Sequence, residues 1–196
     1  QPLDSPRLGP ECPRIDHGRT DLPPRQHEDA LKRTPFYKFH ENNGAKFVEF
    51  AGYELPISYG SIIEEHKQTR ESGSIFDVSH MGRIKLSGRH ARRFLERILT
   101  RRVSDMKPQT CRYSLICNEH GGVLDDVLVY RFDNHWLLVV NAANRDKLTR
   151  HFDLQKDDLA VKIEDQTDST GMVAVQGPKV IDMIGEFSKE IPTLKR

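Results

Sequence analysis

The chain has 196 residues, with 30 Lys and Arg against 29 Asp and Glu and a formal net charge of +1. This length suits one medium domain, or one domain with part of a second. The near-neutral charge argues against nucleic acid as the main partner, because nucleic-acid-binding domains carry an excess of basic residues. No apolar run approaches the roughly 20 residues that cross a bilayer, and no stretch resembles a signal peptide, so we expect no membrane association and a cytoplasmic location.

Residues 1–33 differ in composition from the rest of the chain. Prolines are interleaved with charged residues, and aliphatic residues are scarce. This composition predicts a disordered, proline-rich leader. Its acidic residues argue against a mitochondrial transit peptide, which is rich in Arg and poor in acids.

From residue 34 onward the pattern predicts a compact α+β domain. Ser61 followed by Glu64 forms a capping box, which predicts a helix that ends near Gly73. Residues 74–78 are typical of a strand.

A second strand and helix are expected between residues 82 and 99. Ile84 and Leu86 alternate with polar neighbours, which predicts a half-exposed strand that ends at Gly88. Apolar side chains then recur at helical spacing from 91 to 99, with arginines on the opposite side. The plain interpretation of these arginines is a solvated helix face.

Three further strands are predicted over 113–117, 123–132 and 136–140. Short turns join them, so an antiparallel meander is the economical arrangement. Asn144 is then expected to cap a helix. Strands over 159–163 and 172–175 follow, and Pro178 suits the first turn of a last helix.

The segment Gly121-Gly122-Val123-Leu124-Asp125-Asp126-Val127 places two carboxylates in an apolar strand. Side chains alternate along a strand, so the two Asp side chains point to opposite faces and at most one faces a given pocket. A carboxylate removed from water needs hydrogen-bond donors or a cationic ligand. From these residues alone, a structural Asp in a turn or ion pair is the commoner interpretation, and a binding site is the alternative.

Other chemistries are not indicated. Cys12, Cys111 and Cys117 are an odd number without CxxC spacing, which suits a reducing compartment and supports neither a disulfide framework nor a metal site. The sequence has no P-loop, no G-x-G-x-x-G turn and no H-E-x-x-H helix.

Five segments, in this order, carry a more specific signature. They are Arg33-Thr34-Pro35-Phe36-Tyr37 with Gly44 to Pro56, Gly73 to Gly82, Gly121 to Tyr130, Val139 to Asn144, and Val175-Gln176-Gly177-Pro178. Together they resemble the glycine cleavage system T-protein, the tetrahydrofolate-dependent aminomethyltransferase. The resemblance runs from about Thr34 to the end. It implies antiparallel sheets with flanking helices, as the N-terminal part of the T-protein cloverleaf fold.

The resemblance also implies a reaction. The family transfers a one-carbon unit from the S-aminomethyl-dihydrolipoyl arm of H-protein to tetrahydrofolate, releases ammonia and forms 5,10-methylenetetrahydrofolate. The family motif places Asp126, rather than Asp125, near the reacting end of the folate, where it would position the nucleophile and stabilise an iminium-like cation. A general-base role is weaker, because an Asp of ordinary pKa is a feeble base.

Three further folate contacts are implied by the same resemblance. Asn141 would offer its amide to the folate ring, Tyr113 would pack or hydrogen-bond at the pocket wall, and Met81 would line that wall. From the residues alone, Asn141 fits a loop residue that binds backbone groups, and Tyr113 and Met81 fit core packing. His80 is left out of the site as a satisfied structural histidine.

The length of the chain departs from the family, whose members run to about twice this ordered length. The resemblance implies that the C-terminal barrel is absent, together with an acidic and an arginine contact to the folate. The chain would then be a fragment of a larger product, one half of a two-chain enzyme, or inactive.

Two other classes stay open. One is a folate-binding relative with another activity, such as an iron–sulfur assembly protein or the folate domain of a sarcosine or dimethylglycine oxidase. The other is a non-catalytic fragment that binds a partner through the arginine-rich helix over 89–102. Because H-proteins are generally acidic, this basic face would also suit the docking surface of a working enzyme.

Overall fold

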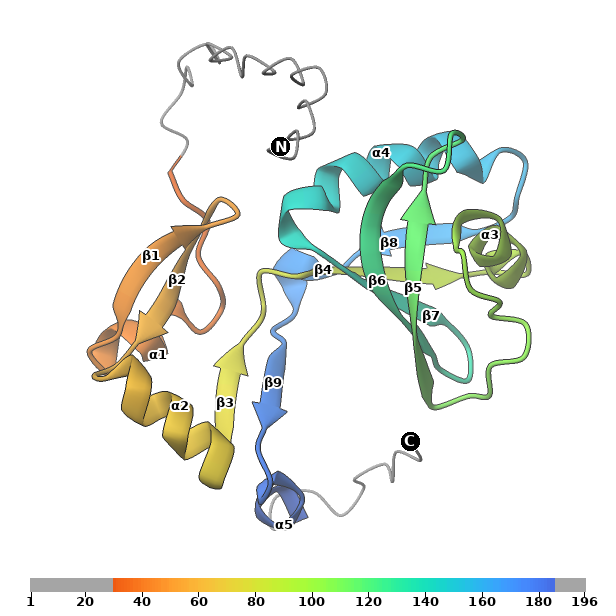
Figure 1. The fold of residues 1–196 in the computed structure, drawn as a ribbon. Helices are drawn as coiled ribbons and strands as arrows, with labels where there is room; N and C mark the ends of the chain where they lie inside the picture. Colours follow the sequence, from red (N-terminus) through yellow and green to blue (C-terminus); the bar gives the residue numbers. More distant parts are fainter. Residues whose placement is uncertain (1–29, 186–196) are drawn as a thin grey trace, which may run out of the picture. The chain divides into compact units, whose positions relative to one another are not determined.

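The structure is a computed structural model that describes residues 30–185 (Figure 1). Most of the predicted leader therefore lies outside the described residues. No helix in the described part of the chain is long and apolar enough to cross a bilayer.

The elements in chain order are α1 (Tyr37–Asn42), β1 (Lys46–Phe50), β2 (Tyr53–Ser58), α2 (Ile62–Glu71), β3 (Ser74–Asp77), β4 (Gly82–Ser87), α3 (Ala91–Ile98), β5 (Thr110–Cys117), β6 (Val123–Arg131), β7 (Trp136–Val140), α4 (Arg145–Lys156), β8 (Lys162–Asp165), β9 (Val173–Gln176) and α5 (Val180–Gly185), with short 3-10 turns η1 (Ala142–Asn144) and η2 (Thr167–Ser169).

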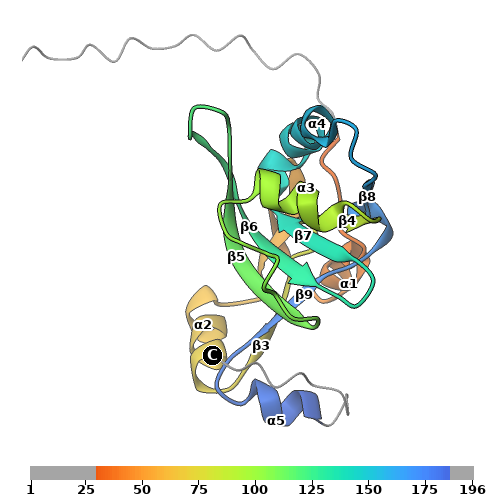
Figure 2. The same ribbon diagram turned by 90° about the vertical axis from the view of Figure 1, so that its right-hand side faces the viewer.

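In residues 30–185 the strands form three antiparallel sheets. The largest has the order β5-β6-β7-β4-β8, and the two others are the pairs β1-β2 and β3-β9. Figures 1 and 2 show β5, β6 and β7 running side by side as consecutive strands. The predicted antiparallel meander is therefore confirmed.

The main core lies between the five-stranded sheet and the helices α3 and α4. Phe94 of α3 meets Phe152 of α4 edge to face, with ring centroids 6.0 Å apart. Both rings are fully buried, together with Val127 and Val129 of β6. Because these β6 residues alternate in sequence, this side of the sheet faces the helices and the other side is left for β6 residues 124, 126, 128 and 130.

Strand β4 is a central strand, which corrects the prediction of a half-exposed one. It pairs with β7 on one side and β8 on the other. Ile84 and Leu86 are buried in the core, and Arg83, on the opposite face, is only 4% exposed. A polar residue in an alternating pattern looks solvent-exposed in sequence, but here the Arg83 guanidinium donates hydrogen bonds to the distant residues Thr167 and Thr170.

The strand predicted over 159–163 starts later than expected, since β8 begins at Lys162. The preceding residues form a turn in which Leu159 N donates to Lys156 O and Val161 N donates to Leu159 O. Ala160 O accepts a hydrogen bond from His90 N. The Ala160 carbonyl therefore binds the residue before α3 and does not pair with a neighbouring strand.

Helix α2 begins where the capping box predicts. Ser61 Oγ accepts a hydrogen bond from Glu64 N at 3.4 Å. The return contact comes from the next residue, since Glu65 Oε1 accepts from Tyr59 N and Gly60 N at 2.9 and 3.0 Å. These bonds satisfy backbone donors just before the helix.

The last residues assigned to the leader contact the β1-β2 pair. Lys32 N donates to Gly52 O at 2.9 Å, and Lys32 O accepts from Glu54 N at 2.9 Å. Arg33 forms an ion pair with Glu54 at 3.0 Å. Lys32 and Arg33 thus already contact the β1-β2 pair within the described residues.

Candidate functional site

A glycine turn sets the position of the two carboxylates on β6. Gly121 has φ +79°, which an L side chain rarely adopts, and a Cβ at Gly122 would lie 3.0 Å from the side chain of Asn118. The Asn118 side-chain oxygen accepts from His120 N and Gly122 N at 3.0 and 2.8 Å. The two glycines therefore allow the tight connection from β5 to β6.

Asp125 points toward the core and is 3% exposed. Its carboxylate accepts from Asn141 N at 3.0 Å, Asn141 Nδ2 at 2.9 Å and Asn144 Nδ2 at 2.5 Å. Three N–H donors satisfy a buried carboxylate without a cation. Asp125 is thus the structural carboxylate that sequence reasoning described as the commoner case.

Asp126 points to the opposite face and is exposed. Tyr113 of β5 donates its hydroxyl to Oδ2 at 2.8 Å, and Asn141 Nδ2 lies 2.8 Å from Oδ1. The structure thus brings together three of the four side chains predicted for the site.

Asn141 links the two carboxylates. Its Nδ2 lies within hydrogen-bond distance of Asp125 Oδ1, Asp126 Oδ1 and Asp126 O. Two N–H groups are therefore shared among three acceptors. In the described part of the chain, Oδ1 of Asn141 accepts no hydrogen bond, so this oxygen is free to bind a donor.

The face around Asp126 is open and negative. Tyr113 is 55% exposed and Val123 is 60% exposed. The hydrogen bond to Asp126 raises the pKa of Tyr113 above its ordinary value, and partial burial and the charges of Asp126 and Asp125 act in the same direction. Such a surface favours a ligand that brings N–H donors or develops positive charge.

Met81 lies outside this hydrogen-bond cluster. It precedes Gly82, which is paired with Val140 at the end of the β4-β7 ladder where Asn141 follows. The carbonyl of Met81 accepts from Arg83 Nη1 at 2.7 Å. Met81 is therefore held by its backbone at the sheet end that also carries Asn141.

His80 differs from the satisfied histidine that was expected. Its Nδ1 is buried and has no hydrogen-bond partner among the described residues. Phe50 packs against the ring with centroids 5.6 Å apart. Burial lowers the pKa of His80, so the imidazole is neutral at pH 7.

Sequence reasoning missed two features. Asn144 stands at the N-cap position of α4 but makes no capping bond, because its side chain is turned to Asp125. Its three-residue spacing from Asn141 was the available signal. The second feature is a relay in which buried His40 lies between Asp77 and the exposed Tyr59: His40 Nε2 is 3.0 Å from Asp77, and His40 Nδ1 is 2.5 Å from Tyr59 OH. No local pattern indicates this relay, since its residues come from α1, from the turn after β2 and from β3.

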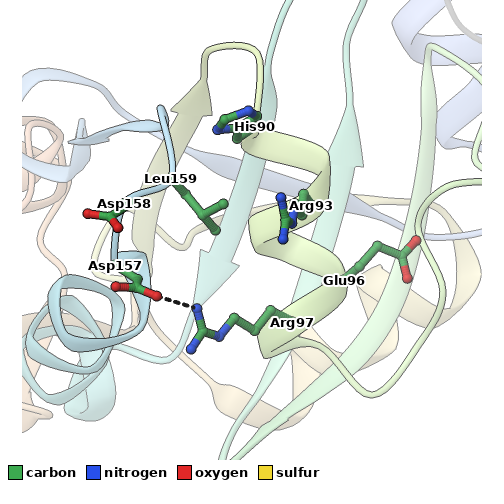
Figure 3. A pocket seen from close by; sticks show the side chains of 7 residues that line it. All are labelled: His90, Arg93, Glu96, Arg97, Asp157, Asp158 and Leu159. Carbon is green, nitrogen blue, oxygen red and sulfur yellow. Dashed lines mark ion pairs between the residues drawn. The ribbon is translucent and has the colours of Figure 1, made fainter.

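Two hollows lie on other parts of the described chain. One of about 840 Å³ is lined by residues of β2, α2 and β3, together with His40 of α1 and Tyr59, which follows β2. The other, of about 560 Å³, lies between α3 and residues 157–159 (Figure 3). The lining of neither hollow includes Asp126.

Comparison with known proteins defines the class to which this fold and site belong. Residues 36–194 match the family described as GCVT N-terminal domain. The solved structure of glycine cleavage system aminomethyltransferase T from Bartonella henselae is 31% identical, with a TM-score of 0.76 over 80% of this chain and 44% of that chain. This likeness confirms the predicted mixed fold of helices and antiparallel sheets.

Curated relatives of this chain are named aminomethyltransferases. The aminomethyltransferase of Rubrobacter xylanophilus is 43% identical over 158 residues, which cover 81% of this chain and 42% of the relative. That of Desulforamulus reducens is 45% identical over 150 residues, covering 76% of this chain and 41% of the relative. The chain belongs to the GCVT N-terminal domain family and corresponds to the N-terminal part of aminomethyltransferases. It spans less than half the length of these relatives.

Proposed function

We propose that this chain acts as an aminomethyltransferase of the glycine cleavage system. The reaction would transfer the one-carbon unit from the S-aminomethyl-dihydrolipoyl arm of H-protein to tetrahydrofolate and release ammonia, as part of glycine catabolism. Family membership supports the reaction class. The observation that carries the proposal is the contact of Asp126 with both Tyr113 and Asn141 on an open face.

The free hydrogen-bonding capacity of this cluster suits tetrahydrofolate. A carboxylate has about four lone-pair sites, and the described side chains bind Asp126 at two of them, one on each oxygen. The remaining sites would accept N–H groups of the folate. Asn141 Oδ1 would accept another N–H group of the folate. The expected contact of the Asn141 amide with the folate ring would then be made by its oxygen.

Asp126 would act through position and charge. Its carboxylate would hold the folate amine that receives the one-carbon unit and would stabilise the positive charge that develops as the carbon–sulfur bond breaks. Tyr113 would fix one carboxylate oxygen, and Asn141 would fix the other. In this proposal Met81 contributes to the wall of the folate site.

A second candidate is a folate-binding or partner-binding fragment without catalytic activity. The observation that leaves room for it is the exposure of the Asp126 face, where Tyr113 is 55% exposed and Val123 is 60% exposed. The open face around Asp126 is consistent with both candidates, because residues from another polypeptide segment would complete the enclosure.

The proposal also includes a cellular setting. Cys111 and Cys117 are free thiols in the described structure, which fits a reducing compartment such as the cytoplasm. The proposed macromolecular partner is lipoylated H-protein, and no role for nucleic acid or membrane is proposed.

The test is single-turnover transfer with the chain as given. H-protein carrying the S-aminomethyl group is mixed with the chain and tetrahydrofolate, and 5,10-methylenetetrahydrofolate and ammonia are measured. We expect both products with the unaltered chain, loss of both in Asp126→Asn, and retention in Asp153→Asn, which removes an equal charge from an exposed position of α4. Folate binding without turnover would favour the second candidate. Turnover that is equal in Asp126→Asn and the unaltered chain would contradict the proposed role of Asp126.

A further inference from the structure

Strand β6 extends past the end of its neighbour β7. The last backbone pair between the two strands joins Leu128 to Val139, whereas β6 begins at Val123. In the described sheet, the residues of β6 before Leu128 therefore face no strand on the β7 side. Their backbone groups on that side need other partners.

Side chains that follow β7 take the place of the missing strand. Asn141 Nδ2 lies 3.2 Å from Asp126 O, and Lys147 Nζ donates to Leu124 O at 2.7 Å. Carbonyls two residues apart on a strand point to the same side, so both bonds lie along one edge of β6. The backbone that carries Asp126 is thus held by β5 on one side and by residues 141 and 147 on the other.

The side chain of Asn144 affects how Asn141 shares its amide. Asp125 Oδ1 accepts from Asn144 Nδ2 at 2.5 Å and from Asn141 Nδ2 at 2.9 Å, and the same Asn141 nitrogen lies 2.8 Å from Asp126 Oδ1. Asp125 is only 3% exposed, so water cannot replace a donor that its carboxylate loses. Without Asn144, the Asp125 carboxylate would draw the Asn141 amide away from Asp126.

The position of Asn144 in its own helix supports this interpretation. It stands at the N-cap of α4, where an Asn side chain commonly accepts a hydrogen bond from the first backbone N–H groups. Asn144 makes no such bond, because its amide is turned to Asp125. The side chain therefore serves β6 and not the end of its own helix.

We infer that Asn144 and Lys147 are positioning residues of the proposed folate site. Asn144 keeps the Asn141 amide on Asp126, and Lys147 holds the backbone of β6 next to Asp126. No hydrogen bond joins either side chain to Asp126 in the described structure, so both act through other groups. The inference rests on the proposed function, since it assigns these roles to a site that binds tetrahydrofolate.

The first test is a double-mutant cycle of Asn144→Ala and Asp126→Asn in the whole chain, with tetrahydrofolate affinity measured by calorimetry. We expect Asn144→Ala to weaken binding roughly fivefold, but less than about twofold in the Asp126→Asn background, because residues that act through one another are not additive. Unchanged affinity in Asn144→Ala, or equal losses in both backgrounds, would overturn the role of Asn144. Asn134→Ala, in the exposed turn before β7, is the control and should bind like the unaltered chain.

Lys147 is tested in the same way. Lys147→Met keeps the aliphatic stem and removes the donor to Leu124 O, so we expect roughly threefold weaker binding, again largely lost in the Asp126→Asn background. Lys46→Met, at an exposed position of β1, makes the same change in charge and should leave the affinity unchanged. Equal effects of the two lysine variants would overturn the role of Lys147. Circular dichroism of each variant establishes that the chain is folded.

A readout without folate separates failure of the inference from failure of the proposed function. The side-chain amide of Asn141 is followed by ¹⁵N NMR and assigned by its loss in Asn141→Ala. Asp126→Asn should shift this resonance strongly in the unaltered background and less in the Asn144→Ala background, because the amide has then moved to Asp125. Equal shifts would overturn the inference. The expected shifts without folate binding would support the positioning of Asp126 and contradict the proposed function.

Discussion

Tyr113 on β5 donates a 2.8 Å hydrogen bond to Asp126 on β6, although the residue directly opposite Asp126 is Leu115. Tyr113 comes two positions before Leu115 on β5 and so lies on the same face as Leu115. Diagonal neighbours on one face of an antiparallel pair are within reach of long side chains. The contact is therefore a consequence of the register that the glycine turn sets.

The two adjacent carboxylates should differ in their effect on stability. Asp125→Asn replaces an acceptor of three N–H bonds by a group that carries its own donors, so we expect a loss of about 1–3 kcal/mol in the free energy of unfolding. Asp126→Asn, at an exposed position, should change it by less than about 0.5 kcal/mol. Urea unfolding measures both values. An equal loss in both variants would contradict the assignment of Asp125 as the structural carboxylate.

The phenol of Tyr113 should titrate above its ordinary pKa of 10.0 in the folded chain, because its hydrogen bond and the nearby negative charges favour the protonated form. The sign follows from linkage: the stabilising contribution is present below the unfolded pKa and is lost as the pH rises through the raised folded pKa. NMR of tyrosine labelled at Cζ measures this pKa. In Asp126→Asn it should fall toward 10.0. An unchanged value in the variant would show that Asp126 does not hold the phenol.

Arg83 should be important for stability through its guanidinium. This buried group donates to Ser79 O, Met81 O, Thr167 O and both oxygens of Thr170. A lysine cannot make all of these bonds, so we expect Arg83→Lys to lose about 2–4 kcal/mol in the free energy of unfolding. Arg92→Lys, on the exposed side of α3, is the control and should change it by less than about 0.5 kcal/mol. Similar stability of the two variants would contradict this role.

Gly177 should not tolerate a side chain. It has φ +134°, and a Cβ there would lie 2.5 Å from both Gly73 Cα and Ser72 O. Because backbone atoms cannot yield as a flexible side chain does, Gly177→Ala should lower the free energy of unfolding by about 1–3 kcal/mol. Gly60→Ala meets no atom within 4 Å and serves as the control. The measurement is thermal unfolding, and equal melting temperatures would contradict the close approach of the two segments.

Local patterns in the sequence predicted the elements that depend on neighbouring residues. The spacing of Phe94, Leu95 and Ile98 predicted the buried side of α3, and all three side chains are buried. The short turns predicted the β5-β6-β7 meander. Capping by Ser61 marked the start of α2.

Features that depend on distant residues were not predictable in this way. The Arg83 side chain binds Thr167 and Thr170, which are separated from it by 84 and 87 positions in the sequence. Alternation alone therefore made β4 look half-exposed. Strand alternation separated Asp125 from Asp126 but did not say which one is buried. The resemblance selected Asp126 for the site, and the structure adds that Asp125 is occupied by Asn141 and Asn144.

Titration calorimetry of tetrahydrofolate into the chain tests the central claim most directly. The unaltered chain should bind saturably, and Asp126→Asn should bind roughly 10- to 100-fold more weakly, because a hydrogen bond to a charged group contributes about 1.5–3 kcal/mol. Asp153→Asn should bind like the unaltered chain. Absence of binding to a folded chain, or equal affinity in Asp126→Asn, would contradict a folate site at Asp126.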